Sequence, residues 1–205
     1  MYALRELEQL AAQIRACRKC PLGRSRTHAV PGEGPADAEM MFIGEAPGYY
    51  EDQQGRPFVG ASGRLLERLL AIIGLAREDV YITNVVKCRP PGNRDPLPAE
   101  IEACRPWLHQ QIALIDPLVI VTLGRFSMAQ FLPAHARITR VHGKPVVQKD
   151  GRVIVPMFHP AAALRNPSWM QSMESDFAQL PQLLEELRHQ RQNQNDDPPQ
   201  QLSLF

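Results

Sequence analysis

Short apolar runs alternate with helical patterns along this chain, and this alternation restricts the possible folds more than any other feature of the sequence. The runs of strand length occupy residues 39–43, 80–86, 118–123 and 152–158. Apolar residues recur at helical spacing in the intervening and flanking segments, at residues 3–16, 62–73, 98–115, 124–132 and 168–188. Alternating strands and helices form mostly parallel sheets with helices on both faces. We therefore expect an α/β fold around a mostly parallel sheet of four strands.

The apolar runs also indicate where a ligand would bind. The run Leu118-Val-Ile-Val-Thr-Leu123 lacks the alternation of a half-exposed strand, as expected for a strand buried on both faces. Ligands of such folds bind at the carboxyl ends of the strands. A functional site is therefore expected among the segments that follow the four strands, at residues 44–60, 87–94, 124–126 and 159–167.

Charge and hydropathy exclude several classes of protein. The 205-residue chain carries 23 Lys and Arg against 22 Asp and Glu, which excludes a strongly basic coat protein and an acidic disordered chain. No apolar run approaches the roughly 20 residues that span a membrane. Arg5, Glu6 and Glu8 interrupt the first apolar pattern, which is unlike a secretory signal. We expect a monomeric cytoplasmic protein that does not associate with membranes.

The end of the sequence differs in composition from the rest. Residues 189–201 contain no apolar residue apart from two prolines, so they cannot contribute to a core. We expect one folded domain over residues 1–188 and a disordered tail over residues 189–205.

Four cysteines form two pairs, Cys17-x2-Cys20 and Cys88-x15-Cys104. Structural disulfides are not expected in a cytosolic chain, so metal ligation is the first alternative, and four reduced buried thiols are the second. Zinc and an iron–sulfur cluster both accept four thiolates. The second pair lacks the Cys-x2-Cys spacing that zinc ribbons repeat, which favours a cluster.

Motifs in the strand-end loops occur together with these cysteines. They are Gly44-Glu-Ala-Pro-Gly48, Phe58-Val-Gly60, Asn84-Val-Val-Lys-Cys-Arg-Pro-Pro-Gly-Asn-Arg94 and His159-Pro160. In this order, from Cys17 to about residue 188, the chain resembles the family 4 uracil-DNA glycosylases. The resemblance implies a three-layer α/β/α sandwich that hydrolyses the N-glycosidic bond of deoxyuridine in DNA, and it implies a [4Fe–4S] cluster on the four cysteines.

The resemblance also implies roles for individual loop residues. Glu45 and Ala46 lie in the loop that contacts uracil and the reacting sugar. Phe58 stacks on the flipped base, Asn84 reads the uracil edge, and His159 faces O2. Ala46 stands where the best-known relatives carry a water-activating Asp, so Glu45 is the carboxylate we assign to orienting water or stabilising the sugar cation. Gly48 replaces a Tyr that excludes thymine there, which leaves Glu51 or Tyr49 to guard C5.

Chemistry supports these residue types, although each also has a structural explanation. A carboxamide at Asn84 matches the N3–H and O4 of uracil, and a donor at His159 would stabilise charge on the leaving base. Without the resemblance, Asn84 would be read as a turn residue, Phe58 as a core residue and His159 as structural about as often as catalytic. A non-catalytic binder of uracil DNA and a zinc-containing nucleic-acid-binding module are the competing hypotheses. Residues 89–98 contain no His and no insertion, which counts against covalent trapping.

The last residues resemble the short peptide by which bacterial repair proteins dock on the replicative sliding clamp. The segment Gln201-Leu-Ser-Leu-Phe205 presents three large apolar side chains after a polar stretch. We expect clamp binding through Gln201, Leu202, Leu204 and Phe205. The alternatives are a chance tail and a strand that packs on the domain.

Overall fold

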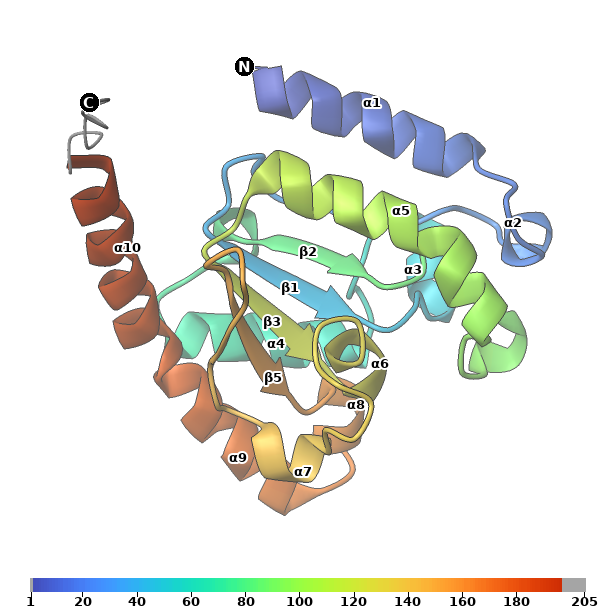
Figure 1. Ribbon diagram of the computed structural model, residues 1–205. Helices are drawn as coiled ribbons and strands as arrows, with labels where there is room; N and C mark the ends of the chain where they lie inside the picture. The colour runs from blue at the N-terminus through green and yellow to red at the C-terminus, as the bar shows by residue number, and fades with distance from the viewer. Residues whose placement is uncertain (1, 197–205) are drawn as a thin grey trace, which may run out of the picture.

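The expected sheet is present, with five strands in the order β2-β1-β3-β5-β4 (Figure 1). The structure is a computed structural model that describes residues 2–196. Its strands are β1 (Met40–Gly44), β2 (Tyr81–Asn84), β3 (Val119–Leu123), β4 (Val146–Val147) and β5 (Val153–Met157). All neighbouring pairs are parallel except β4 and β5. The four predicted strands are confirmed with small shifts of their ends, and β4 is an addition too short to leave a pattern in the sequence.

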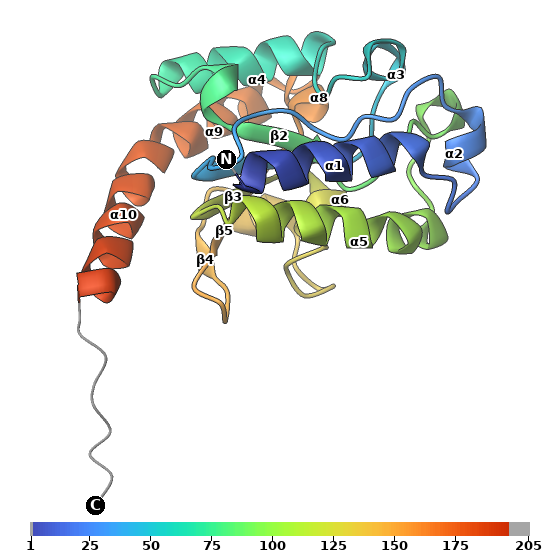
Figure 2. The same cartoon turned by 90° about the horizontal axis from the view of Figure 1, so that it is seen from above.

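One face of the sheet is covered by α5 (Pro98–Ile115), with α1 (Tyr2–Ala16) packed beside it (Figure 2). Alternate strand residues such as Met41, Ile43 and Ile120 point into this layer, where they meet Leu108 and Ile112 of α5. Five apolar side chains from the strands and helices are fully or almost fully excluded from water, so this layer is a continuous core: Ile14, Met41, Ile43, Leu108 and Ile120.

The opposite face is covered by α4 (Ala61–Ile72), α9 (Pro167–Ala178) and the first turns of α10 (Leu180–Asp196). Phe42 of β1 stacks on Phe177 of α9 with ring centroids 5.8 Å apart. Leu66 and Leu70 of α4 are completely buried against the same strands. Helices on both faces give the three-layer α/β/α sandwich that was predicted.

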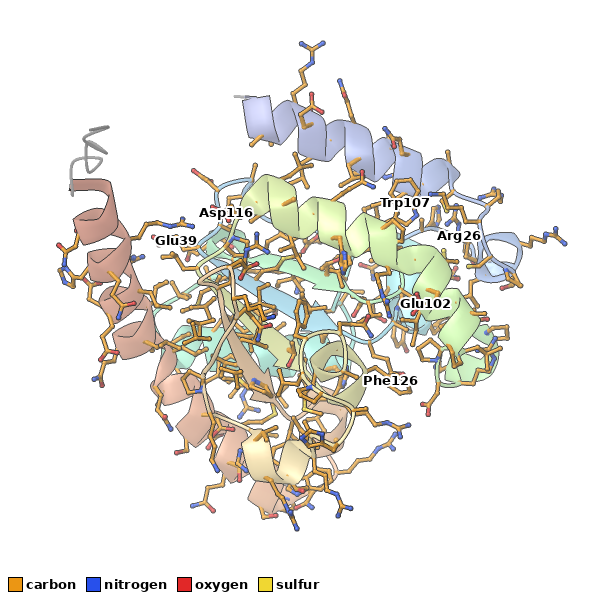
Figure 3. The ribbon with its side chains drawn as sticks, viewed as in Figure 1. Arg26, Glu39, Glu102, Trp107, Asp116 and Phe126 are labelled. Carbon is orange, nitrogen blue, oxygen red and sulfur yellow. The ribbon has the colours of Figure 1, made fainter. Side chains whose placement is uncertain are left out.

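The final helix continues beyond the expected end of the folded part. It extends through Asp196 instead of ending at Arg188, and it makes ion pairs with acidic residues beside the ends of β1 and α5. Arg188 binds Glu39, and Arg191 binds Asp116 at 2.9 Å. Figure 3 shows Glu39 and Asp116 on the side of the sheet that faces α10. The proposed peptide, Gln201, Leu202, Leu204 and Phe205, lies outside the described residues.

Short helices and turns form many of the connections between the larger elements. They are α2 (Leu22–Ser25), α3 (Tyr49–Gln54), α6 (Arg125–Met128), α7 (Ile138–Val141) and α8 (Pro160–Ala163), with 3-10 turns at Arg77–Asp79 and Pro91–Asn93. The predicted helix over residues 124–132 is reduced to α6. Among residues 2–196, no helix combines the length and apolar character needed to cross a membrane.

Candidate active site

The carboxyl ends of the parallel strands lie level with one another and bring the predicted loops together. Gly44 at the end of β1 pairs with Asn84 at the end of β2, and Leu123 of β3 pairs with Met157 of β5. One further hydrogen bond extends the second pair, from the Gly124 N–H to the Met157 carbonyl at 2.8 Å. Loops from four strands therefore begin at the same edge.

These loops enclose a cavity of about 720 Å³. Six predicted site residues line it together, although they come from separate parts of the chain: Glu45, Ala46, Gly48, Phe58, Asn84 and His159. Six polar residues to which the sequence analysis gave no role also line the cavity: Ser62, Asn93, Arg94, Asp95, Arg125 and Arg165. Arg125 lies in a segment expected to border the site, but an isolated charged residue carries no further signal.

Asn84, at the end of β2, is buried and lines this cavity. Its side-chain oxygen Oδ1 is buried and has no hydrogen-bond partner among the described residues. Its main-chain carbonyl accepts a hydrogen bond of 2.8 Å from Lys87 Nζ, which also donates to Thr83 Oγ1 and Gln111 Oε1. Lys87 is fully buried, and burial lowers its pKa to about 7. The unpaired Oδ1 can therefore accept a hydrogen bond from a ligand in the cavity.

His159 precedes α8, and its imidazole is fixed by the first turn of that helix. The Ala161 N–H donates to His159 Nδ1 at 3.1 Å, so a neutral ring carries its proton on Nε2. Burial lowers the pKa of His159 to about 4. The ring lies 5.9 Å from the ring of Phe58, centroid to centroid. A neutral imidazole with Nε2–H as its donor therefore borders the cavity at physiological pH.

Phe58 lines the cavity and also belongs to the apolar core between the sheet and α4. Only 5% of its surface is exposed, so Phe58 is a core residue that also lines the cavity. Its φ of 51° lies in the left-handed region, which is unusual for a bulky residue. A Cβ at Gly63 would collide with the Phe58 carbonyl, and a Cβ at Gly44 would lie 2.5 Å from Phe58 Cζ. Glycines at both positions make room for this conformation.

Glu45 is half-buried beside an exposed ion pair. Burial raises the pKa of its carboxyl to about 7, with a further rise from the negative charge of Asp95 and an opposing effect from Arg125. Asp95 and Arg125 themselves form an ion pair of 2.5 Å. The carboxyl therefore changes charge near neutral pH.

Glu51 joins the two loops on which the cavity depends. Its Oε1 accepts hydrogen bonds from the N–H groups of Val59 and Gly60 at 2.9 and 3.0 Å, and its Oε2 accepts one from Gly48 at 3.1 Å. Of the two residues expected near C5, Glu51 lines the cavity, whereas Tyr49 is half-exposed and packs against Arg89.

The four cysteines line a second, smaller cavity where α1, α2 and α5 meet. Figure 3 shows Trp107 on α5 and Arg26 after α2 at this place. Arg26 Nη1 lies 2.8 Å from Cys88 Sγ, and the Lys87 N–H lies 3.2 Å from Cys104 Sγ. Burial raises the pKa of Cys104 to about 11, and the positive charge of Lys87 opposes this rise. Within residues 2–196, no group of three or more His, Cys, Asp or Glu side chains is arranged to hold a metal ion.

Comparison with known proteins identifies the family to which this chain belongs. Residues 31–188 match the family described as the uracil DNA glycosylase superfamily. A type-4 uracil-DNA glycosylase of Sulfurisphaera tokodaii is 50% identical over 185 residues, covering 86% of this chain and 84% of the relative. One of Archaeoglobus fulgidus is 48% identical, covering 88% and 94%, and one of Thermotoga maritima is 47% identical, covering 82% and 88%. The resemblance inferred from the motifs is confirmed: the chain belongs to the uracil-DNA glycosylase superfamily and, within it, to the type-4 enzymes.

Proposed function

We propose that this chain removes uracil from DNA by hydrolysing its N-glycosidic bond, leaving an abasic site. The observation that carries this proposal is the buried, unpaired Oδ1 of Asn84 in a cavity that also contains Phe58 and a neutral His159. Uracil would satisfy Oδ1 with its N3–H, while the amide nitrogen of the same side chain would donate to O4. Cytosine presents the opposite pattern at these two positions, so Asn84 selects uracil.

His159 acts on the leaving base. Departure of uracil places negative charge on the base, and a donor fixed at O2 is typically worth roughly 10²–10³ in rate. Because Nδ1 accepts the Ala161 N–H, Nε2–H is the group available for O2. A neutral imidazole stabilises this charge without the unfavourable burial of a cation, which agrees with the lowered pKa of His159.

Phe58 provides the stacking surface for the flipped base. Extruding a nucleotide costs a few kcal/mol, and stacking on an aromatic ring returns roughly 1–3 kcal/mol per base. Its ring borders the cavity beside Asn84 and His159, so the same base can be stacked and hydrogen-bonded.

Glu45 is the carboxylate that we assign to orienting water or stabilising the sugar cation. It lines the cavity beside Ala46, where the best-known relatives carry Asp. Glu51 is the residue we assign to the C5 side of the base, next to Gly48. Both assignments rest on position and on the family resemblance.

We propose that Cys17, Cys20, Cys88 and Cys104 hold a [4Fe–4S] cluster. The residues fit such a group, since four sulfurs surround one cavity and hydrogen bonds from Arg26 and the Lys87 N–H to two of them oppose the effect of burial on these thiols. The cluster would supply a cross-link between α1 and α5. Iron analysis with a visible absorption spectrum tests this, because zinc would leave the protein colourless.

We also propose that residues 1–188 form a monomeric glycosylase domain, and that residues 189–205 include a peptide that binds the sliding clamp. The three large apolar residues in Gln201-Leu-Ser-Leu-Phe205 support clamp binding. Deletion of residues 201–205 should abolish clamp binding and leave activity on short oligonucleotides unchanged. Unchanged clamp binding would contradict the assignment.

Activity is tested with an end-labelled single-stranded oligonucleotide that contains one uracil, treated with the protein and then with alkali. Cleavage at uracil that is lost in Asn84→Ala and in His159→Ala supports the glycosylase and its cavity together. A slowly migrating band that survives denaturation would mean covalent trapping. Intact DNA without such a band would contradict the proposed activity.

A further inference from the structure

Phe58 needs an external constraint to keep its backbone conformation. Its φ of 51° is disfavoured for a bulky L-residue, and residues held in this way are found where the surrounding structure fixes them. The stacking surface for a base must also be placed accurately, because a shift of 1 Å in a positioned group can lower a rate about 10²-fold. What holds Phe58 is therefore relevant to the reaction.

The guanidinium of Arg77 binds the two backbone carbonyls that flank the Cα of Phe58. Its Nη1 donates to the Phe58 carbonyl at 2.8 Å, and its Nη2 donates to the Pro57 carbonyl. Arg77 lies in the 3-10 turn before β2, and only 13% of its side chain is exposed. A planar guanidinium that binds two successive carbonyls fixes their relative orientation.

Arg77 is in turn held by Glu33. The Arg77 Nε donates to Glu33 Oε1, and Arg56 Nε binds Glu33 Oε2 at 2.8 Å. Although burial alone would raise it, hydrogen bonds from Arg56 and Arg77 hold the pKa of Glu33 below its usual value. Glu33 thus stays ionised and keeps its hold on the guanidinium.

The backbone of Glu33 is attached to the strand that carries Asn84. Its N–H donates to the Ile82 carbonyl at 3.0 Å, and the Ile82 N–H donates to the Glu33 carbonyl at 2.8 Å. Ile82 lies two residues before Asn84 on β2. A chain of contacts therefore runs from β2 through Glu33 and Arg77 to Phe58.

We infer that Glu33 and Arg77 are positioning residues that hold the stacking ring of Phe58 in register with the reading amide of Asn84. Neither residue lines the cavity, so they act through Phe58 and not on the base. This inference rests on the proposed function for its kinetic consequence. Its structural part, that Arg77 fixes the Phe58 loop, stands without DNA.

The kinetic test is a double-mutant cycle between Arg77→Lys and Phe58→Ala, measured as single-turnover excision from a uracil-containing duplex. Arg77→Lys keeps the charge but cannot bind two carbonyls, and should lower kcat/KM about 10- to 100-fold. In a protein that already carries Phe58→Ala, Arg77→Lys should lower kcat/KM by less than about threefold, because the ring that Arg77 positions is already absent. Losses that multiply would show that Arg77 does not act through Phe58 and would overturn the inference.

Arg56→Gln is the matched control, since Arg56 binds the same carboxylate but makes no hydrogen bond to the Phe58 loop in the described structure. It should retain kcat/KM within about threefold. Glu33→Gln provides a second route to the same loss if Arg77→Lys does not fold. A loss with Arg56→Gln as large as with Arg77→Lys would mean that general charge, and not the bound loop, is responsible.

Amide hydrogen exchange of the free protein separates the two levels of the proposal. Arg77→Lys should increase exchange at Val59 and Gly60 at least about tenfold, whereas Arg56→Gln should leave it unchanged. Wild-type protein that leaves uracil DNA intact would contradict the proposed function, and the exchange result would then decide the inference alone. Equal exchange in wild type and Arg77→Lys would overturn it.

Discussion

Replacing Asn84 with Ala tests whether its unpaired oxygen is kept for uracil. Only 2% of the residue is exposed, and Oδ1 has no partner within the described chain. A buried polar group without a partner costs about 1–3 kcal/mol, and a neutral hydrogen bond contributes about 0.5–1.5 kcal/mol. Loss of the contacts to N3–H and O4 should therefore weaken transition-state binding by about 2–4 kcal/mol, which is roughly a 30- to 1,000-fold fall in kcat/KM.

The free energy of unfolding should respond differently from the activity. Asn84→Ala breaks no side-chain hydrogen bond of the described structure and removes a buried oxygen that has no partner, so the free energy of unfolding should not fall by more than about 1 kcal/mol. Thr83→Val is the matched control on the same strand, because Thr83 Oγ1 donates to the Pro31 carbonyl at 2.8 Å and accepts from Lys87 Nζ. That variant should lose about 1–3 kcal/mol of stability while keeping kcat/KM within about fivefold.

Single-turnover excision from a uracil oligonucleotide and thermal unfolding measure the two quantities. Asn84→Asp, which keeps the shape but replaces the donor to O4, should lose uracil activity and discriminate less strongly against cytosine. The reasoning would be refuted if Asn84→Ala lost more than about 3 kcal/mol of stability while keeping activity within about fivefold, since Asn84 would then be a structural residue.

Other site residues give further tests. Because Glu45 ionises near pH 7, kcat/KM should rise with pH through about 7 in wild type and lack this rise in Glu45→Gln. His159→Gln should lower kcat/KM roughly 10²-fold without changing the shape of the profile from pH 5 to 9, because the imidazole is already neutral above about pH 4; a new break would contradict this. Gly44→Ala should fold but lose more than about tenfold in kcat/KM, since its Cβ would lie 2.5 Å from Phe58 Cζ. Activity equal to wild type would mean that Phe58 can move aside.

The sheet and the position of the cavity could be predicted because they follow from long, regular patterns. Buried parallel strands give continuous apolar runs, and their carboxyl ends must meet at one edge, which is where Asn84 and His159 lie. The two-residue β4 could not be predicted, because its pairing with β5 depends on tertiary contacts. The helix of residues 189–196 was missed because its support comes from distant acidic residues such as Asp116.

The individual charged residues around the site were harder to foresee. Glu33 and Arg77 are 44 positions apart in the sequence, and neither belongs to a motif. Their significance depends on the left-handed backbone at Phe58, a conformation that the sequence does not reveal for a non-glycine residue. Lysine is rarely fully buried, and only the three acceptors around Nζ of Lys87 explain its buried position.

Burial explains the electrostatic properties of the cavity as a whole. It leaves Oδ1 of Asn84 without water, holds the pKa of His159 near 4 and raises the pKa of Glu45 to about 7. The unpaired Oδ1 strengthens recognition of uracil, and the neutral His159 stabilises charge on the leaving base. The raised pKa of Glu45 means that its carboxyl ionises only at a higher pH. Between pH 4.5 and about 7, Glu45 is protonated in the folded protein but ionised in the unfolded chain. The free energy of unfolding therefore falls as the pH rises through this range. Glu45→Gln should thus gain stability relative to wild type across this range, and Arg125, which opposes the rise, limits the effect.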